Sequence, residues 1–306
     1  MTQPPDDFNP PVGEAIRLSD NVRRVLAPNP SPMTYRGTNT YLLGDRELAV
    51  IDPGPDNAAH LEAILAALEP GQSISHILVT HTHLDHSPLA RALAARTEAP
   101  VLAYGDAQAG RSAVMRDLAA QGLAGGGEGI DTAFVPDITL GDGDIVDGDS
   151  WSLEVIHTPG HLGNHIALAC DASCFTADHV MGWASSLVSP PDGDLTDFMA
   201  SCRTLRSRNW DVFHPGHGAP ITDPGGRLDW LIEHRLAREA AILDQLSDGP
   251  ATARQLAERI YTETPPALLP AAERNVFAHL VDLTGRHRAG PESDLSATAR
   301  FVRLAD

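Results

Sequence analysis

The sequence predicts an α+β fold in which helices cover packed sheets, followed by a small helical domain. Across the first two thirds of the 306 residues, short β-branched or apolar runs alternate with Ala/Leu-rich helical stretches. Gly, Pro and Asp separate these runs, as turns between strands and helices require. From about Pro224, glycine becomes rarer and three Leu/Ala/Arg-rich segments follow. We therefore expect two domains, residues 1–223 and residues 224–306.

Turn residues and the spacing of apolar side chains predict the elements of the first domain. The continuously apolar run 77–80 is typical of a strand buried on both faces. These elements fit a four-layer αββα sandwich, although composition and periodicity also allow other α+β arrangements. In chain order, we expect strands at 38–43, 48–52, 77–80, 101–103, 138–140, 144–146, 151–157, 165–170, 174–177 and 210–214, with helices at 60–68 and 87–95.

The second domain is predicted to be mainly helical. Helical spacing of Leu and Ala covers 228–246, 252–261 and 266–283, and a short apolar run follows at 298–304. Helices of these lengths fit a winged helix. A winged helix can bind DNA, but residues 227–306 hold 10 Arg and 12 acidic residues and so offer no clear basic face.

The charge balance limits the partners of the chain. All 22 basic residues are Arg, 41 residues are acidic, and the net charge is −19. Residues 1–226 carry −17 of this charge. Binding to phosphates needs clustered positive charge, so neither duplex DNA nor an anionic membrane is an expected partner.

Cysteine content and hydropathy indicate the compartment. Three cysteines are too few for a disulfide framework and fit a reducing environment. The first eleven residues are polar and proline-rich, unlike a signal peptide, and no stretch approaches the roughly 18 apolar residues of a membrane span. We expect a cytoplasmic protein.

A cluster of metal-ligand residue types directly follows the strand predicted at 77–80. The residues His81-Thr82-His83-Leu84-Asp85-His86 place three imidazoles and one carboxylate within six positions. Imidazole is a good ligand for zinc and other late first-row metals. Buried polar groups need partners, and crowded imidazoles repel one another once protonated. A shared cation satisfies both requirements, so this segment predicts a metal site.

Three further ligand types follow predicted strands. His161 ends the turn Thr158-Pro159-Gly160-His161, Asp178 follows the strand at 174–177, and His217 lies in Pro215-Gly216-His217-Gly218. Strand ends on one edge of a sheet converge, so we expect these side chains to join the cluster.

The order H-x-H-x-D-H, T-P-G-H, strand-end Asp and P-G-H-G resembles the metallo-β-lactamase superfamily over residues 15–222. The resemblance implies the αββα sandwich. It also implies two Zn²⁺ ions per chain, with Mn²⁺ or Fe²⁺ as alternatives, and a bridging hydroxide that attacks the substrate. It assigns ligands as follows: His81, His83 and His161 to one metal, Asp85, His86 and His217 to the other, and Asp178 to both. Asp85 would be the catalytic residue that orients the nucleophile and takes its proton.

Individual positions refine the resemblance. A His at position 83 resembles the motif of the zinc hydrolases rather than that of the flavo-diiron branch, which has Glu at this position. An Asp at position 178 resembles the motif of the dinuclear hydrolases. The segments Glu233-His234-Arg235, Ala271–Asn275 and His279-Leu280 resemble the winged-helix tail of the β-lactamase-like protein 2 group. In that group the tail forms one wall of the substrate cleft, which we expect here, with binding of a partner as the alternative.

Three functions fit these observations. The first is a hydrolase that attacks an ester, thioester or related acyl substrate. Two divalent ions, two aspartates and a bridging hydroxide would give the metal centre a net charge of about +1, and such a centre within an acidic domain favours a small anionic or carbonyl-bearing molecule. The second, suggested by the β-lactamase-like protein 2 resemblance, is an endonuclease on single-stranded RNA, which the acidity disfavours. The third is a binding module without catalysis, which a complete ligand set disfavours.

Two residues are candidates for supporting roles. His165, four residues after His161, is a candidate to orient a ligand or donate a proton, with a plain strand-face role as the alternative. Trp183 begins a long loop past Asp178 that we expect to border the site, and it is a candidate to stack on substrate.

Overall fold

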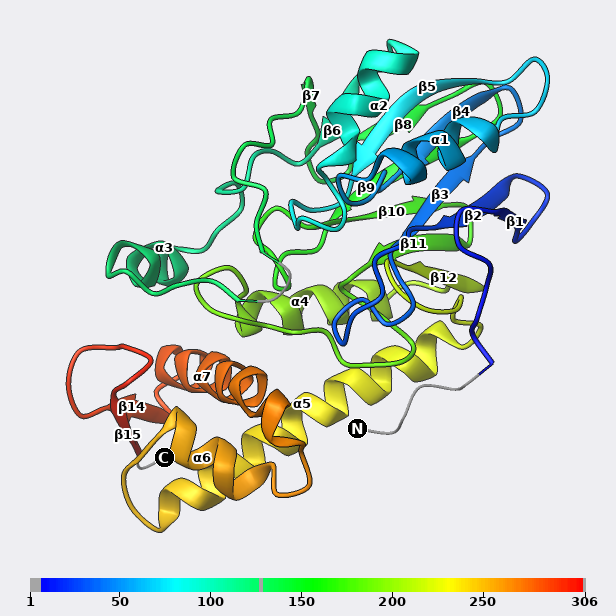
Figure 1. Ribbon diagram of the computed structural model, residues 1–306. Coiled ribbons are helices and arrows are strands. Elements are labelled where there is room, and N and C mark those ends of the chain that lie inside the picture. The colour runs from blue at the N-terminus through cyan, green and yellow to red at the C-terminus, as the bar shows by residue number, and fades with distance from the viewer. Residues whose placement is uncertain (1–6, 127–128, 305–306) are drawn as a thin grey trace.

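The computed structural model describes residues 7–126 and 129–304, and within them two sheets stack face to face between helices (Figure 1). The start of the first predicted domain and the last two residues of the second lie outside this described part. Strands β1 to β4 pair antiparallel with their neighbours, and β4 to β7 pair parallel. The first sheet has the order β1 (Ala15–Arg17), β2 (Val22–Leu26), β3 (Asn39–Leu43), β4 (Glu47–Ile51), β5 (Ser73–Val79), β6 (Val101–Ala103) and β7 (Ile138–Thr139).

The second sheet is antiparallel except at one edge, where β11 and β12 run parallel. Its inner face packs on the first sheet, and Leu153 and Phe175 lie in one fully buried cluster with Leu78 of the first sheet. Its order is β12 (Val212–Pro215), β11 (Ser173–Ala177), β10 (Ile166–Cys170), β9 (Ser152–His157) and β8 (Ile145–Asp147).

Helices cover the outer faces of both sheets. On the first sheet, Ile64 and Leu93 from α1 and α2 pack on Ile77. On the second, Phe198 of α4 and Leu228 of α5 pack in one cluster with strand side chains. This arrangement confirms the predicted four-layer αββα sandwich. The helices of this part are α1 (Ala58–Ala66), α2 (Leu89–Thr97), α3 (Ala113–Ala120) and α4 (Leu195–Arg206).

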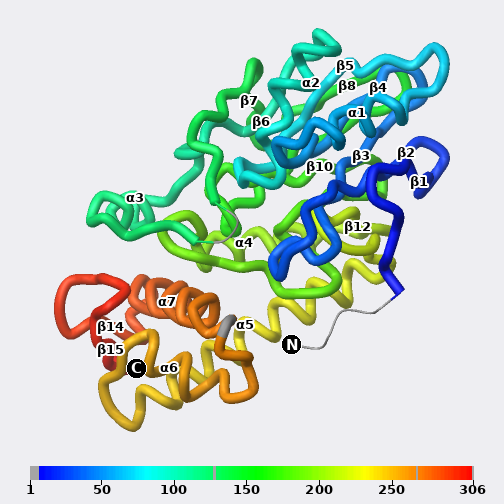
Figure 2. Tube along the Cα trace, in the orientation of Figure 1, coloured from blue at the N-terminus to red at the C-terminus, as the bar shows by residue number. Residues whose placement is uncertain are grey.

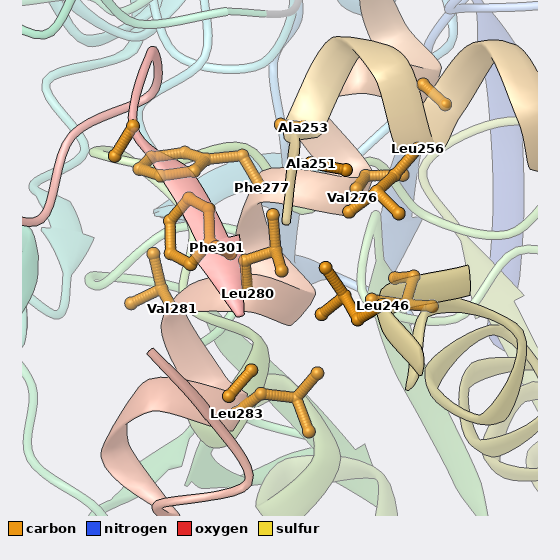
Figure 3. Close-up of a cluster of buried hydrophobic side chains, with 14 of the residues drawn as sticks. Leu246, Ala251, Ala253, Leu256, Val276, Phe277, Leu280, Val281, Leu283 and Phe301 are labelled. Carbon is orange, nitrogen blue, oxygen red and sulfur yellow. The ribbon is translucent and has the colours of Figure 1, made fainter. Parts of the chain in front are cut away.

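The C-terminal part is built around a separate apolar cluster (Figure 3), to which Met115 and Leu118 of α3 also belong. Leu256, Val276, Leu280 and Phe301 meet there from two helices and a short sheet of order β13-β15-β14. Thr252 caps α6 reciprocally with Gln255, which fixes where that helix begins. The elements are α5 (Pro224–Ser247), β13 (Ala251–Thr252), α6 (Ala253–Ile260), η1 (Pro266–Leu268), α7 (Leu269–Gly285), β14 (Ala289–Pro291) and β15 (Arg300–Arg303).

Helix α5 joins the two parts (Figure 2). Its first half packs under the second sheet through Leu228 and Leu231, and its last turns enter the C-terminal core through Ile242 and Leu246. The domain division predicted after residue 223 stays a prediction, because this helix belongs to both cores. Among the described residues, no helix has the length and apolar character needed to cross a membrane.

The structure differs from the sequence prediction in where elements end and in several elements that were not predicted. The predicted strands and helices are present with ends shifted by a few residues, but β1, β2, α3, α4 and the short strands β13 and β14 were not predicted. Strand β2 was missed because it carries Arg23 and Arg24, which read as polar and yet are buried. Arg23 bonds to Ala67 O, and Arg24 lies over the Phe8 ring.

Candidate metal centre

The fold brings all seven predicted ligands to one edge of the sandwich. The segment 81–86 follows β5, and His161, Asp178 and His217 follow β9, β11 and β12. All seven side chains are buried. The structure therefore joins residues that lie up to 136 positions apart in the sequence.

Glycines allow the turns that carry these ligands. A Cβ on Gly216 would lie 2.2 Å from Asp178 Oδ1, and one on Gly160 would lie 2.3 Å from the backbone of Phe198. Gly160 also has a φ of +135°, in the region that favours glycine. The Pro-Gly-His pattern at both turns thus follows from close approach of the backbone to neighbouring groups.

The first ligand group is formed by three imidazoles and a carboxylate. His83 Nδ1 lies 3.0 Å from both His81 Nε2 and His161 Nε2. Asp178 Oδ2 lies 3.7 Å from His161 Nε2. One donor atom from each of the four residues lies within 4.8 Å of the other three.

The second group shares Asp178 with the first. His217 Nε2 lies 3.2 Å from Asp85 Oδ2 and 3.3 Å from Asp178 Oδ2. His86 Nε2 lies 3.3 Å from Asp85 Oδ2 and 3.5 Å from Asp178 Oδ1. The two carboxylates and two imidazoles thus face one point.

These donors fit divalent cations. Ligand atoms around a tetrahedral zinc ion, at its usual bond lengths, lie about 3.3 Å apart, close to the separations found here. Asp85 Oδ1, His86 Nε2 and Asp178 Oδ1 are buried and have no hydrogen-bond partner among the described residues. Buried polar atoms of this kind require a partner. A cation at each group would provide it.

The ring nitrogens that face away from the centre are held by acceptors. His161 Nδ1 donates to Leu187 O at 2.8 Å, and His217 Nδ1 to Gly37 O at 3.1 Å. Carbonyl oxygens only accept, so both rings carry their proton on Nδ1 and leave Nε2 free to bind a metal.

Asp52 was missed as a site residue by sequence reasoning. Its Oδ2 accepts from His86 Nδ1 at 2.9 Å and from Thr80 Oγ1 at 2.8 Å. Because the Thr80 hydroxyl donates to Asp52, it accepts from His81 Nδ1, which lies 3.0 Å away. Asp52 thus orients two ligand histidines. The sequence feature that could have identified Asp52 is its position in the Asp52-Pro53-Gly54 turn, directly after a strand.

Thr38 was also missed. Its Oγ1 donates to Asp85 Oδ2 at 3.1 Å, and Asn29 in turn donates to Thr38 Oγ1 at 2.9 Å. Thr38 therefore fixes Asp85 Oδ2, whereas Asp85 Oδ1 has no hydrogen bond within the described part of the chain.

The two ligand groups differ in electrostatics. Burial, and after it the neighbouring His161, lower the pKa of His83 to about 3. Burial also disfavours the cation of His217, but Asp178 and Asp85 outweigh it and raise the pKa of His217 to about 10. The pKa of His86 rises for the same reason. At neutral pH the first group is thus ready for a cation, whereas the second must release protons to bind one.

The structure places the two supporting candidates beside the centre. His165 is fully buried with its ring centroid 5.1 Å from that of His81, and its Nδ1 lies 2.8 Å from Thr158 Oγ1. Trp183 stacks on Tyr35 at 5.1 Å, and a Cβ on Gly218, the neighbour of His217, would lie 2.9 Å from its ring. His165 is close enough to affect a ligand ring, whereas Trp183 already has an aromatic partner.

A separate pocket of about 120 Å³ lies between α4, α5 and α7. Arg203, Arg235 and His279 are among its lining residues, and none of the seven ligands is. The pocket and the buried His/Asp cluster are thus separate features of the molecule.

Comparison with known proteins identifies the class. Residues 33–217 match the Metallo-beta-lactamase superfamily, and residues 252–295 match the Beta-lactamase associated winged helix domain. The chain belongs to the metallo-β-lactamase superfamily and is a hydrolase of that superfamily. The predicted family, fold class and enzyme class are confirmed.

Particular relatives narrow the comparison. The chain is 32% identical to a beta-lactamase-like protein 2 homolog of Drosophila melanogaster, over 91% of this chain and 93% of that protein. It is 28% identical to the atrochrysone carboxyl ACP thioesterase dmxR1 of Cryptosporiopsis sp. (strain 8999), over 81% and 70% of the two chains. A beta-lactamase domain protein from Burkholderia ambifaria shares the fold, with a TM-score of 0.80 and 23% identity over 99% and 97% of the two chains.

Proposed function

We propose that the protein is a dinuclear zinc hydrolase that cleaves an ester, thioester or related acyl substrate. The observation that carries this proposal is the pair of buried ligand groups that share Asp178. His81, His83 and His161 would hold one ion, and Asp85, His86 and His217 the other. Five imidazoles and two carboxylates suit zinc, with Mn²⁺ and Fe²⁺ as alternatives.

The chain's own residues support hydrolysis. Two divalent cations would lower the pKa of a shared water toward roughly 7 and polarise the substrate carbonyl. Asp85 Oδ2 accepts a hydrogen bond from Thr38, and Oδ1 has no hydrogen-bond partner in the residues that the structure describes. Asp85 Oδ1 can therefore orient the attacking water and accept its proton. Asp52 keeps His86 in place. Burial of the whole cluster excludes bulk water from these groups.

The net charge of the chain and its similarity to a thioesterase favour an acyl substrate. Residues 1–226 carry a net charge of −17, which repels a long polyanion before it reaches the centre. A relative named as an acyl carrier protein thioesterase supports thioester chemistry. The second candidate, cleavage of single-stranded RNA, is what the sequence resemblance to the β-lactamase-like protein 2 group implies, and a homolog of that group is among the relatives of this chain.

One experiment separates the two candidates. Zinc-loaded protein is incubated with an acyl thioester, a lactone, bis(p-nitrophenyl) phosphate and a single-stranded RNA oligomer, each at about 50 and 200 mM salt, a range over which phosphate-dependent binding weakens steeply. We expect acyl turnover to be the fastest and nearly independent of salt. Efficient RNA cleavage that is absent from Asp85→Asn would instead establish the nuclease function.

A further inference from the structure

The loop between β11 and α4 lies between the metal centre and the C-terminal part. Ser186, Val188 and Ser189 in this loop are buried, although they belong to no helix or strand. Buried irregular backbone needs partners for its polar groups. These partners come from the metal centre on one side and from α5 and α7 on the other.

On the side of the metal centre, the loop holds two of the candidate ligands. Leu187 O accepts the Nδ1 hydrogen of His161 at 2.8 Å. Ser186 Oγ bonds to Asp178 O and, at 2.9 Å, to His179 O. The position of residues 186–187 therefore sets the ring of His161 and the backbone of Asp178.

On the other side, the loop is held by α5 and α7. Arg235 Nη2 donates to Ser186 O, and Arg235 Nη1 donates to Asn275 Oδ1 at 3.1 Å. The same Asn275 oxygen accepts from Val188 N at 3.4 Å. Arg274 adds a bond from Nη1 to Ser189 Oγ at 3.0 Å. Three side chains of the C-terminal part thus hold residues 186, 188 and 189 of the loop.

Arg235 is unusual because it is buried without a counter-ion. Its side chain is 3% exposed, and among the described residues no carboxylate forms an ion pair with it. Its guanidinium carbon lies 5.2 Å from the centre of the Phe198 ring. A buried charge is tolerated only when hydrogen bonds satisfy it. The Nε of Arg235 has no hydrogen-bond partner among the described residues. The bonds from Nη1 to Asn275 and from Nη2 to Ser186 therefore both stabilise the buried guanidinium and hold the loop.

We propose that Arg235 and Asn275 are positioning residues through which the C-terminal part orients His161 and Asp178. This inference rests on the proposed metal-binding roles of those two residues. The other oriented ligands depend on the first sheet and the turns next to it, because their outer partners are Thr80, Asp52 and Gly37. The winged-helix part thus belongs to the construction of the metal centre.

The test compares Arg235→Leu with Arg238→Leu. Arg238 is one turn away on the same helix and stacks on Tyr261 at 4.0 Å. Within the described part of the chain it forms no hydrogen bond to the loop, so Arg238→Leu makes the same charge change without affecting contacts of residues 186–189. The readouts are zinc affinity by chelator competition, and hydrogen exchange of the amides of residues 186–189 in the metal-free protein.

We expect Arg235→Leu to weaken zinc binding by about 10–100-fold, as loss of an outer partner of a metal ligand does, and to speed exchange in the loop. Arg235→Lys, which can still donate to Ser186 O, should recover part of both effects. Arg238→Leu should change neither. Asn275→Ala removes the oxygen that accepts from Arg235 Nη1 and Val188 N but keeps the Arg235 side chain and its bond to Ser186 O. This variant should show the same changes, and it serves as the test if Arg235→Leu does not fold.

Unchanged zinc affinity and unchanged exchange in folded Arg235→Leu or Asn275→Ala would overturn the inference. Equal effects in Arg238→Leu would also overturn it, since they would reflect general destabilisation. If the wild-type protein takes up no zinc, the proposed function fails, and the exchange measurement alone then decides whether these residues hold the loop.

Discussion

Two parts of the ligand shell are supported in different ways. His81, His86 and His217 are oriented by Thr80, Asp52 and Gly37, which lie in or next to the first sheet. His161 and Asp178 are held by the loop 186–188, whose outer anchors come from α5 and α7. One half of the centre is thus intrinsic to the sandwich, whereas the other half depends on contact between the two parts of the chain.

Removing Asp178, the residue that the two ligand groups share, should have the largest effect. Asp178→Ala takes a carboxylate from both ligand groups, so zinc content should fall for both and activity should drop by more than the about 10²–10⁴-fold that a general base contributes. Metal analysis after zinc reconstitution and an acyl-thioester assay measure the change. Wild-type zinc content in this variant would show that Asp178 does not join the two groups.

Asp85→Asn should have the next largest effect on activity. Asparagine keeps the shape of the side chain and can still accept from Thr38, but it cannot take a proton from water. We expect a loss of about 10²–10⁴-fold in kcat while the fold and much of the bound zinc remain. Unchanged kcat would remove Asp85 from the chemistry and leave it at most a ligand.

Asp52→Asn tests the half supported by the first sheet. It removes the carboxylate that holds His86 and Thr80, and we expect zinc affinity to fall by about 10–100-fold. Loop exchange at residues 186–189 should stay as in the wild type, in contrast to Arg235→Leu. Faster exchange in this loop would contradict the division of the shell into two independently supported halves.

Substitution of His60 should have the smallest effect at neutral pH, because it changes the free energy of unfolding mainly at acid pH. His60 is buried next to Thr40, and burial lowers its pKa to about 4. A pKa depressed on folding contributes no instability above pH 6.5 but costs stability as the pH falls from 6.5 through 4. His60→Gln should reduce this acid-induced loss by up to about 3 kcal/mol, as followed by urea unfolding at pH 7 and pH 4.5. An unchanged difference between the two pH values would contradict a neutral buried imidazole.

The sequence predicted those features that depend on local patterns. Residues 81–86 form a compact motif, and His161, Asp178 and His217 follow strands, so their convergence followed from the ends of the sheet. The supporting residues were not predictable in this way. Asp52, Thr38 and Arg235 act through partners that are distant in sequence, and no periodicity marks such pairs. Helix α4 was missed because Thr, Ser and Cys interrupt its apolar face.

A crystal structure of the zinc-loaded protein, with anomalous scattering at the zinc edge, tests the dinuclear centre directly. We predict two peaks per chain, one between His81, His83 and His161 and one between Asp85, His86 and His217, with Asp178 in contact with both. A single peak, or peaks away from these residues, would contradict the dinuclear centre on which the proposed hydrolase rests.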